Sequence, residues 1–179
     1  MTSRHPFQLA AGAALSIALV LAGCGNDPST KPAANGGTDA VAAMVTKGAV
    51  DGVPVMQAKG RTAKGQEVSI TGRIGGSEEP FASDRAVFTV VDASLKSCAE
   101  GGDPDHCATP WDYCCEDRQS LKMATATVEI ADADGRPLPV AVRGTAGLDP
   151  LARVTVTGTV IDCNDRGLLV VRATRIAVH

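Results

Sequence analysis

The chain has 179 residues, enough for one domain of ordinary size in addition to a targeting segment. Its formal net charge of −3 argues against a general nucleic-acid binder, which needs a basic surface to neutralise phosphates. Hydrophobic residues make up 44% of the chain but aromatic residues only 3%, so the core has to be built from aliphatic side chains. The valines among them favour strands.

Residues 1–23 have the features of an export signal. Arg4 gives a positively charged start, and a mostly apolar run extends from Leu9 to Leu21. That run is too short for a spanning helix, which needs about 20 residues. We therefore predict a signal peptide over 1–23.

The signal ends in Leu21-Ala22-Gly23-Cys24, which resembles the lipobox of bacterial lipoproteins. The resemblance implies that Cys24 becomes the first residue and carries a diacylglycerol and an N-acyl chain, which together anchor a protein durably. It implies a lipid-anchored protein of the cell membrane or outer membrane that faces the periplasm or the exterior. The membrane is then its one identified partner. The alternative is a plain secretory signal followed by a coincidental cysteine.

The next segment, 24–47, is rich in Gly, Pro, Asn, Ser and Thr in its first half and predicts a flexible tether, with a short helical turn near Asp39–Val45. A domain over 48–179 follows. Alternation of polar and apolar residues predicts an all-β domain. The expected strands are Glu67–Ile74, Arg85–Asp92, Ala124–Ala131, Leu138–Val142, Leu151–Asp162 and Gly167–Val178.

Three of these strands carry patterns that resemble the OB-fold. They are the segments Val68–Ile74 and Val154–Val160, each with a central glycine, and Phe88–Asp92. The resemblance implies a small barrel of five to six strands, with a long cysteine-rich insertion at 93–123 between the second and third strands. Nucleic-acid binding does not follow, because Phe88 is the only aromatic on the strands that OB-folds use for it.

The insertion concentrates the reactive side chains. Disulfide bonds are the first interpretation of its cysteines, because an exported domain meets an oxidising compartment. The candidates are Cys98, Cys107, Cys114, Cys115 and Cys163, and an odd number leaves one of them unpaired. A bond between adjacent Cys114 and Cys115 would be strained, so we expect each to pair elsewhere.

The alternative is a metal or thiol-redox site, since thiolates and imidazole suit zinc or cuprous copper. Its candidate ligands are Cys98, His106, Cys107, Cys114 and Cys115. The objection is their spacing, because structural zinc sites usually bring ligands in C-x₂₋₄-C pairs, and none is present. The first interpretation needs no cofactor, and the second needs zinc or copper.

The insertion also holds Trp111, Asp112 and Tyr113, in a segment Thr-Pro-Trp-Asp-Tyr-Cys-Cys that resembles one in uncharacterised secreted bacterial proteins. The two aromatic residues are expected to cap the barrel, and the alternative is a platform for a ligand. No catalytic motif is present, so no enzymatic activity is expected. The sequence thus predicts a lipid-anchored extracytoplasmic binding or structural module, with a metal or redox protein as the alternative.

Overall fold

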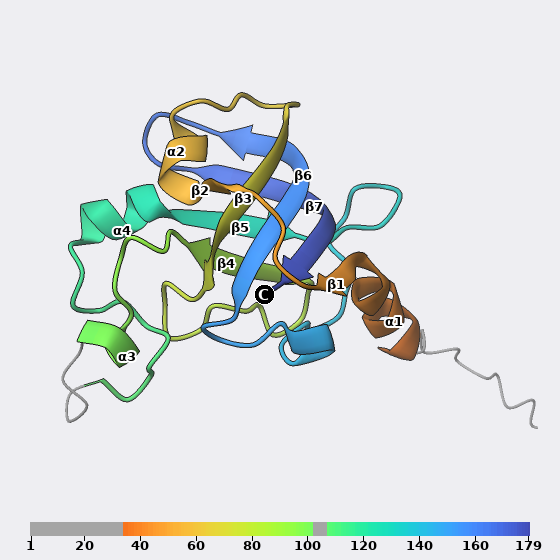
Figure 1. Ribbon diagram of the computed structural model, residues 1–179. Helices are drawn as coiled ribbons and strands as arrows, with labels where there is room; N and C mark the ends of the chain where they lie inside the picture. Colours follow the sequence, from red (N-terminus) through yellow and green to blue (C-terminus); the bar gives the residue numbers. More distant parts are fainter. Residues whose placement is uncertain (1–33, 102–106) are drawn as a thin grey trace, which may run out of the picture. The chain divides into compact units, whose positions relative to one another are not determined.

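The computed structural model describes residues 34–101 and 107–179, which belong to one folded unit (Figure 1). The expected signal peptide, Cys24 and His106 lie outside the described residues.

Five strands close into a barrel by pairing in a ring. β3 (Glu67–Ile74) pairs antiparallel with β4 (Val87–Val91), and β4 pairs antiparallel with β5 (Thr125–Glu129). β5 pairs in parallel with β7 (Leu169–Val178), which pairs antiparallel with β6 (Arg153–Cys163). The ring closes where β6 pairs antiparallel with β3. The prediction of a small β-barrel is therefore confirmed, with five strands of mixed direction.

Two details of the predicted barrel are wrong. The strand expected over Leu138–Val142 is absent, and this segment is irregular in the structure. Pro137 and Pro139 lack the N–H groups that a strand ladder needs, so only the isolated bridge between Ala131 and Pro137 forms there. The cysteine-rich insertion lies between β4 and β5, and not between the second and third strands, because two short strands precede the barrel.

Those two strands extend the sheet at its edges. β1 (Val45–Lys47) pairs in parallel with β7, and β2 (Val53–Pro54) pairs in parallel with β3. Helix α1 (Ala34–Met44) precedes β1 and buries Val41 completely against the core. The segment expected to be a flexible tether thus forms a helix and a paired strand from residue 34 onward.

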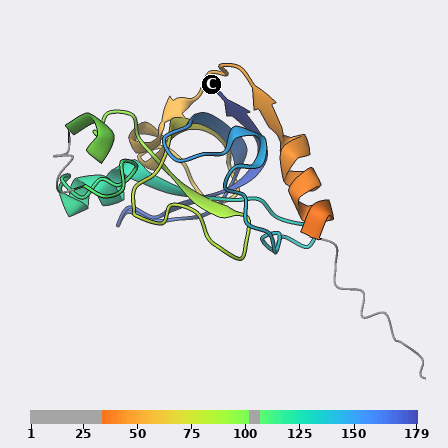
Figure 2. The same cartoon turned by 90° about the horizontal axis from the view of Figure 1, so that it is seen from below.

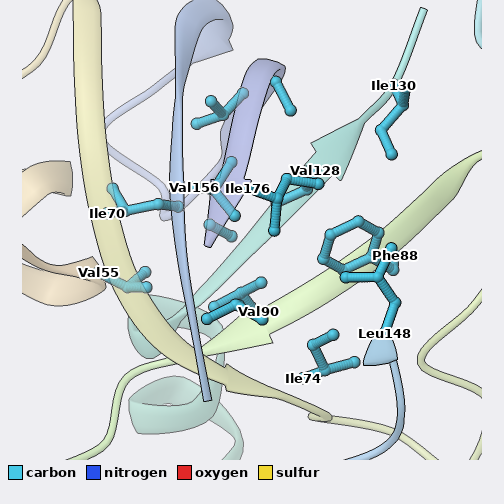
Figure 3. Close-up of a cluster of buried hydrophobic side chains, with 14 of the residues drawn as sticks. Val55, Ile70, Ile74, Phe88, Val90, Val128, Ile130, Leu148, Val156 and Ile176 are labelled. Atoms are coloured by element: carbon cyan, nitrogen blue, oxygen red, sulfur yellow. The ribbon is translucent and has the colours of Figure 1, made fainter. Parts of the chain in front are cut away.

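The barrel interior is filled by aliphatic side chains, with Phe88 as its largest labelled member (Figure 3). Strand β3 illustrates how the strands fill this interior. Every second residue from Val68 to Ile74 is buried, because successive side chains of a strand point to opposite faces. Helix α2 (Val55–Lys59) adds Val55 and Ala58 to the same cluster. The 3-10 turn η1 (Thr145–Gly147) is followed by the fully buried Leu148.

The remaining helices belong to the cysteine-rich insertion. They are α3 (Cys98–Gly101) and α4 (Arg118–Ala124), and the side chain of Asp117 begins α4 by accepting a hydrogen bond from the Ser120 N–H at 2.8 Å. Figures 1 and 2 show both helices on the side of the barrel away from α1. The cysteine-rich insertion, which carries the candidate site residues, therefore lies on the side of the barrel opposite α1.

Candidate metal centre

The two arms of the insertion are joined by backbone hydrogen bonds. The Cys98 N–H donates to the Asp112 carbonyl at 2.8 Å, and the Ala99 N–H donates to the Pro110 carbonyl at 3.0 Å. These bonds place the start of α3 beside the segment that leads to Cys114. Cysteines that are distant in sequence are thereby brought together.

A β-turn presents the adjacent pair Cys114 and Cys115. The Glu116 N–H donates to the Tyr113 carbonyl at 3.0 Å, which makes the two cysteines the central residues of the turn. The turn is held on both sides: Tyr113 is completely buried, and the Glu116 carboxylate accepts a hydrogen bond from the Lys96 N–H at 2.9 Å. The two thiols therefore lie on a well-anchored support.

The four sulfur atoms of the insertion form one cluster. Cys98 Sγ lies 3.3 Å from Cys114 Sγ, which lies 3.6 Å from Cys107 Sγ and 4.0 Å from Cys115 Sγ. All four sulfurs are within 4.8 Å of one another. We call this set (Cys98, Cys107, Cys114 and Cys115) the thiol cluster.

The spacing of the sulfurs matches ligands of one ion. Zinc binds thiolates at about 2.3 Å, and the edges of such a tetrahedron are about 3.8 Å long. A disulfide bond would bring two sulfurs to about 2.05 Å, and no pair of the described cysteines is that close. The disulfides expected from the sequence are therefore not shown.

Hydrogen bonding within the cluster separates the acidities of its thiols. Burial acts to raise the pKa of Cys98, but hydrogen bonds from Cys114, including one from its backbone N–H, and from Cys107 outweigh burial and lower it. The hydrogen bond with Cys98 raises the pKa values of Cys114 and Cys107. Protons are thus shared, and deprotonation belongs to the cluster as a unit. Cys98 is the thiol that this arrangement favours as a thiolate.

An arginine from the barrel ties the insertion to strand β3. The Arg73 guanidinium forms an ion pair with Glu100 and donates hydrogen bonds to the carbonyls of Ala93 and Leu95, each at 3.3 Å. The Glu100 carboxylate also accepts from the Ser97 N–H at 3.1 Å, and the Arg73 hydrogen bond lowers the pKa of Glu100. Sequence reasoning missed Arg73 because its partners are 20 or more positions away along the chain.

The aromatic residues hold the insertion in place. Trp111 donates its Nε1–H to the Glu78 carbonyl at 2.9 Å, and the Arg143 guanidinium carbon lies 5.1 Å from the centre of its ring. Asp112 accepts from the Tyr113 N–H at 2.7 Å. The Tyr113 hydroxyl is buried and has no hydrogen-bond partner among the described residues.

The structure separates Cys163 from the other described cysteines. Cys163 ends β6 and is half-buried, and its Sγ donates to the Thr62 carbonyl at 3.8 Å. It takes no part in the thiol cluster. The odd number of cysteines expected from the sequence is explained in this way, with four residues grouped and one apart.

Sequence reasoning also passed over Lys59. Its ammonium group donates to the carbonyls of Lys122 at 2.7 Å and Gly167 at 2.6 Å, so it joins α4 to the β6–β7 hairpin. Burial and the nearby charge of Lys122 lower the pKa of Lys59 to about 8.

None of the helices in the described ranges is long and apolar enough to span a membrane. Comparison with protein-family models, with curated proteins and with solved structures gave no match. The fold and the thiol cluster are therefore the features that bear on the function of this protein.

Proposed function

We propose that this protein is a metal-binding module that holds one zinc ion in the thiol cluster. The observation that carries the proposal is the mutual distance of four sulfurs, all within 4.8 Å. Four thiolates form the tetrahedral ligand set of many structural zinc sites. Sulfurs this close fit the ligand shell of a single ion, whereas a cluster of several irons spreads its cysteines over different metal atoms.

The surrounding hydrogen bonds support the same function. A metal ligand has to be a thiolate, and the Cys114 N–H directed at Cys98 stabilises that form. The bonds from Cys98 and Ala99 to the opposite arm hold the ligands together, as outer-shell partners do in metal sites. The absence of C-x₂₋₄-C pairs in the sequence does not argue against this site, because the fold of the insertion brings the four cysteines together.

The domain that holds the ion is proposed to be an OB-like barrel, exported and lipid-anchored through Cys24. The cyclic order of the five strands, with β5 and β7 as the one parallel pair in the ring, supports the OB-like interpretation. The lipobox resemblance supports both the anchor and a location at the periplasmic or outer face of a membrane. The proposed role of the protein is to bind a metal ion and not to catalyse a reaction.

A disulfide-stapled insertion is the second candidate. The 3.3 Å separation of the Cys98 and Cys114 sulfurs favours this pair as the first to join under oxidation. Two disulfides would use all four thiols of the cluster and leave no ligand for an ion. The two candidates therefore exclude each other in the same molecule.

Metal and thiol content distinguish them. The full chain, purified from membranes without oxygen, is expected to contain one zinc per molecule and five alkylatable thiols in its domain after the metal is removed. Cys98→Ser should lose the zinc, whereas the control Cys163→Ser should keep it. A metal-free protein with two disulfides would instead establish the stapled insertion.

A further inference from the structure

The thiol cluster is buried on one side and exposed on the other. Cys98 is buried and Cys107 is half-buried, whereas Cys114 and Cys115 are exposed. The sulfur contact between Cys98 and Cys114 is partly buried, and the contact between Cys114 and Cys115 is exposed. An incoming thiol can therefore approach the cluster from the side of Cys114 and Cys115.

We propose that the centre is an exchange site, through which the protein passes its metal ion to an acceptor that binds with thiolates. The inference rests on the proposed metal-binding function and assigns a role to the exposed edge formed by Cys114 and Cys115. An incoming ligand reaches the ion over that edge. Cys98, on the buried side, keeps the ion in place until the acceptor holds it.

The support of the turn allows this exchange without unfolding. Tyr113 on one side and Glu116 on the other are fixed by burial and by the bond to Lys96. Movement of the two ligands is therefore confined to the central residues of one turn. Cys98 is fixed by its backbone bond to Asp112 and is the last ligand to leave.

The step is a ligand substitution without change of oxidation state. The sulfur of an incoming thiol forms a bond to zinc, and the bond from zinc to Cys115 breaks. The proton of the incoming thiol passes to the Cys115 sulfur. Cys114 follows in the same way, and no oxidant or reductant is consumed.

The acceptor is defined by its chemistry, and two sources could supply it. A small thiol would substitute one ligand at a time, whereas a protein or peptide with a Cys-x-x-Cys pair would take the ion with two. Both reach the same exposed edge. Separate arms of one experiment distinguish the two sources.

The test uses the full chain loaded with natural zinc and incubated with an isotopically enriched zinc salt. Native mass spectrometry is expected to show isotope exchange within minutes, at a rate proportional to added glutathione. S-methylglutathione, which has no thiol, should leave the rate unchanged. In the second arm, a reduced Cys-x-x-Cys peptide should remove zinc faster than glutathione at equal thiol concentration if the acceptor is a protein.

Two variants separate the exposed edge from the buried side. Cys115→Ser should still bind one zinc but exchange it at least about tenfold faster, since loss of an outer-shell partner already costs about 10–100-fold in metal affinity and loss of a direct ligand costs no less. Cys163→Ser should exchange at the wild-type rate. A loaded protein that retains its natural zinc for a day with both glutathione and the Cys-x-x-Cys peptide overturns the exchange site and leaves metal binding intact, whereas failure to bind zinc overturns both.

Discussion

The substitution of Tyr113 by alanine and by phenylalanine tests whether its ring anchors the cysteine turn to the barrel. Tyr113 is completely buried and packs with Val91 and Ala124. An aromatic side chain buries about 150–250 Å². At about 25 cal/mol per Å², this corresponds to about 4–6 kcal/mol, which is an upper limit because unfolded chains are partly compact.

Large-to-small core substitutions of aromatic residues cost about 3–5 kcal/mol, so we expect a loss of this size in the free energy of unfolding for Tyr113→Ala. Tyr113→Phe should leave stability unchanged or raise it slightly, because the hydroxyl has no partner in the described part of the chain. Urea unfolding of both variants measures the difference. Zinc titration should show about 10–100-fold weaker binding for Tyr113→Ala alone.

Two results for these variants would contradict the expected role of Tyr113. A loss below about 1 kcal/mol for Tyr113→Ala would mean that the ring is not an anchor. A loss above about 1 kcal/mol for Tyr113→Phe would mean that the hydroxyl makes a hydrogen bond.

Three further predictions concern residues outside the thiol cluster. Gly158→Ala should destabilise the fold by several kcal/mol in thermal melts, because a Cβ would collide with the Arg172 carbonyl at the β6–β7 bulge; an unchanged melting temperature would contradict this. Asp117→Ala should cost about 0.5–2 kcal/mol through loss of the α4 cap, and Asp117→Asn, which keeps the cap, much less. Because the folded pKa of Lys59 is lowered to about 8, the folded state binds fewer protons than the unfolded state between about pH 8 and 10.5. Stability should therefore rise with pH in this window, and Lys59→Met should lack this part of the rise.

The barrel strands could be predicted because their pattern is local. In β3 the alternation of side chains gives both bounds, and in the β6–β7 hairpin Asn164 and Gly167 mark the turn. The strand expected over Leu138–Val142 does not form: its valines alternate correctly, but Pro139 and the preceding Pro137 prevent pairing. Local alternation alone does not include that backbone constraint.

The thiol cluster could be predicted only in part. The sequence identified its cysteines, but their spacing argued against a metal site. The ligands converge because Cys98 and Ala99 pair with Asp112 and Pro110, and such non-local backbone bonds leave no periodic signal in the sequence. The contribution of Arg73 is hidden for the same reason, since it comes from a barrel strand.

X-ray absorption spectroscopy at the zinc edge tests the central claim most directly. For the full chain purified without oxygen and loaded with one zinc ion, the account predicts a single shell of four sulfurs at about 2.3 Å. A shell of nitrogen and oxygen ligands, or a protein that takes up no zinc while its thiols remain reduced, would contradict it.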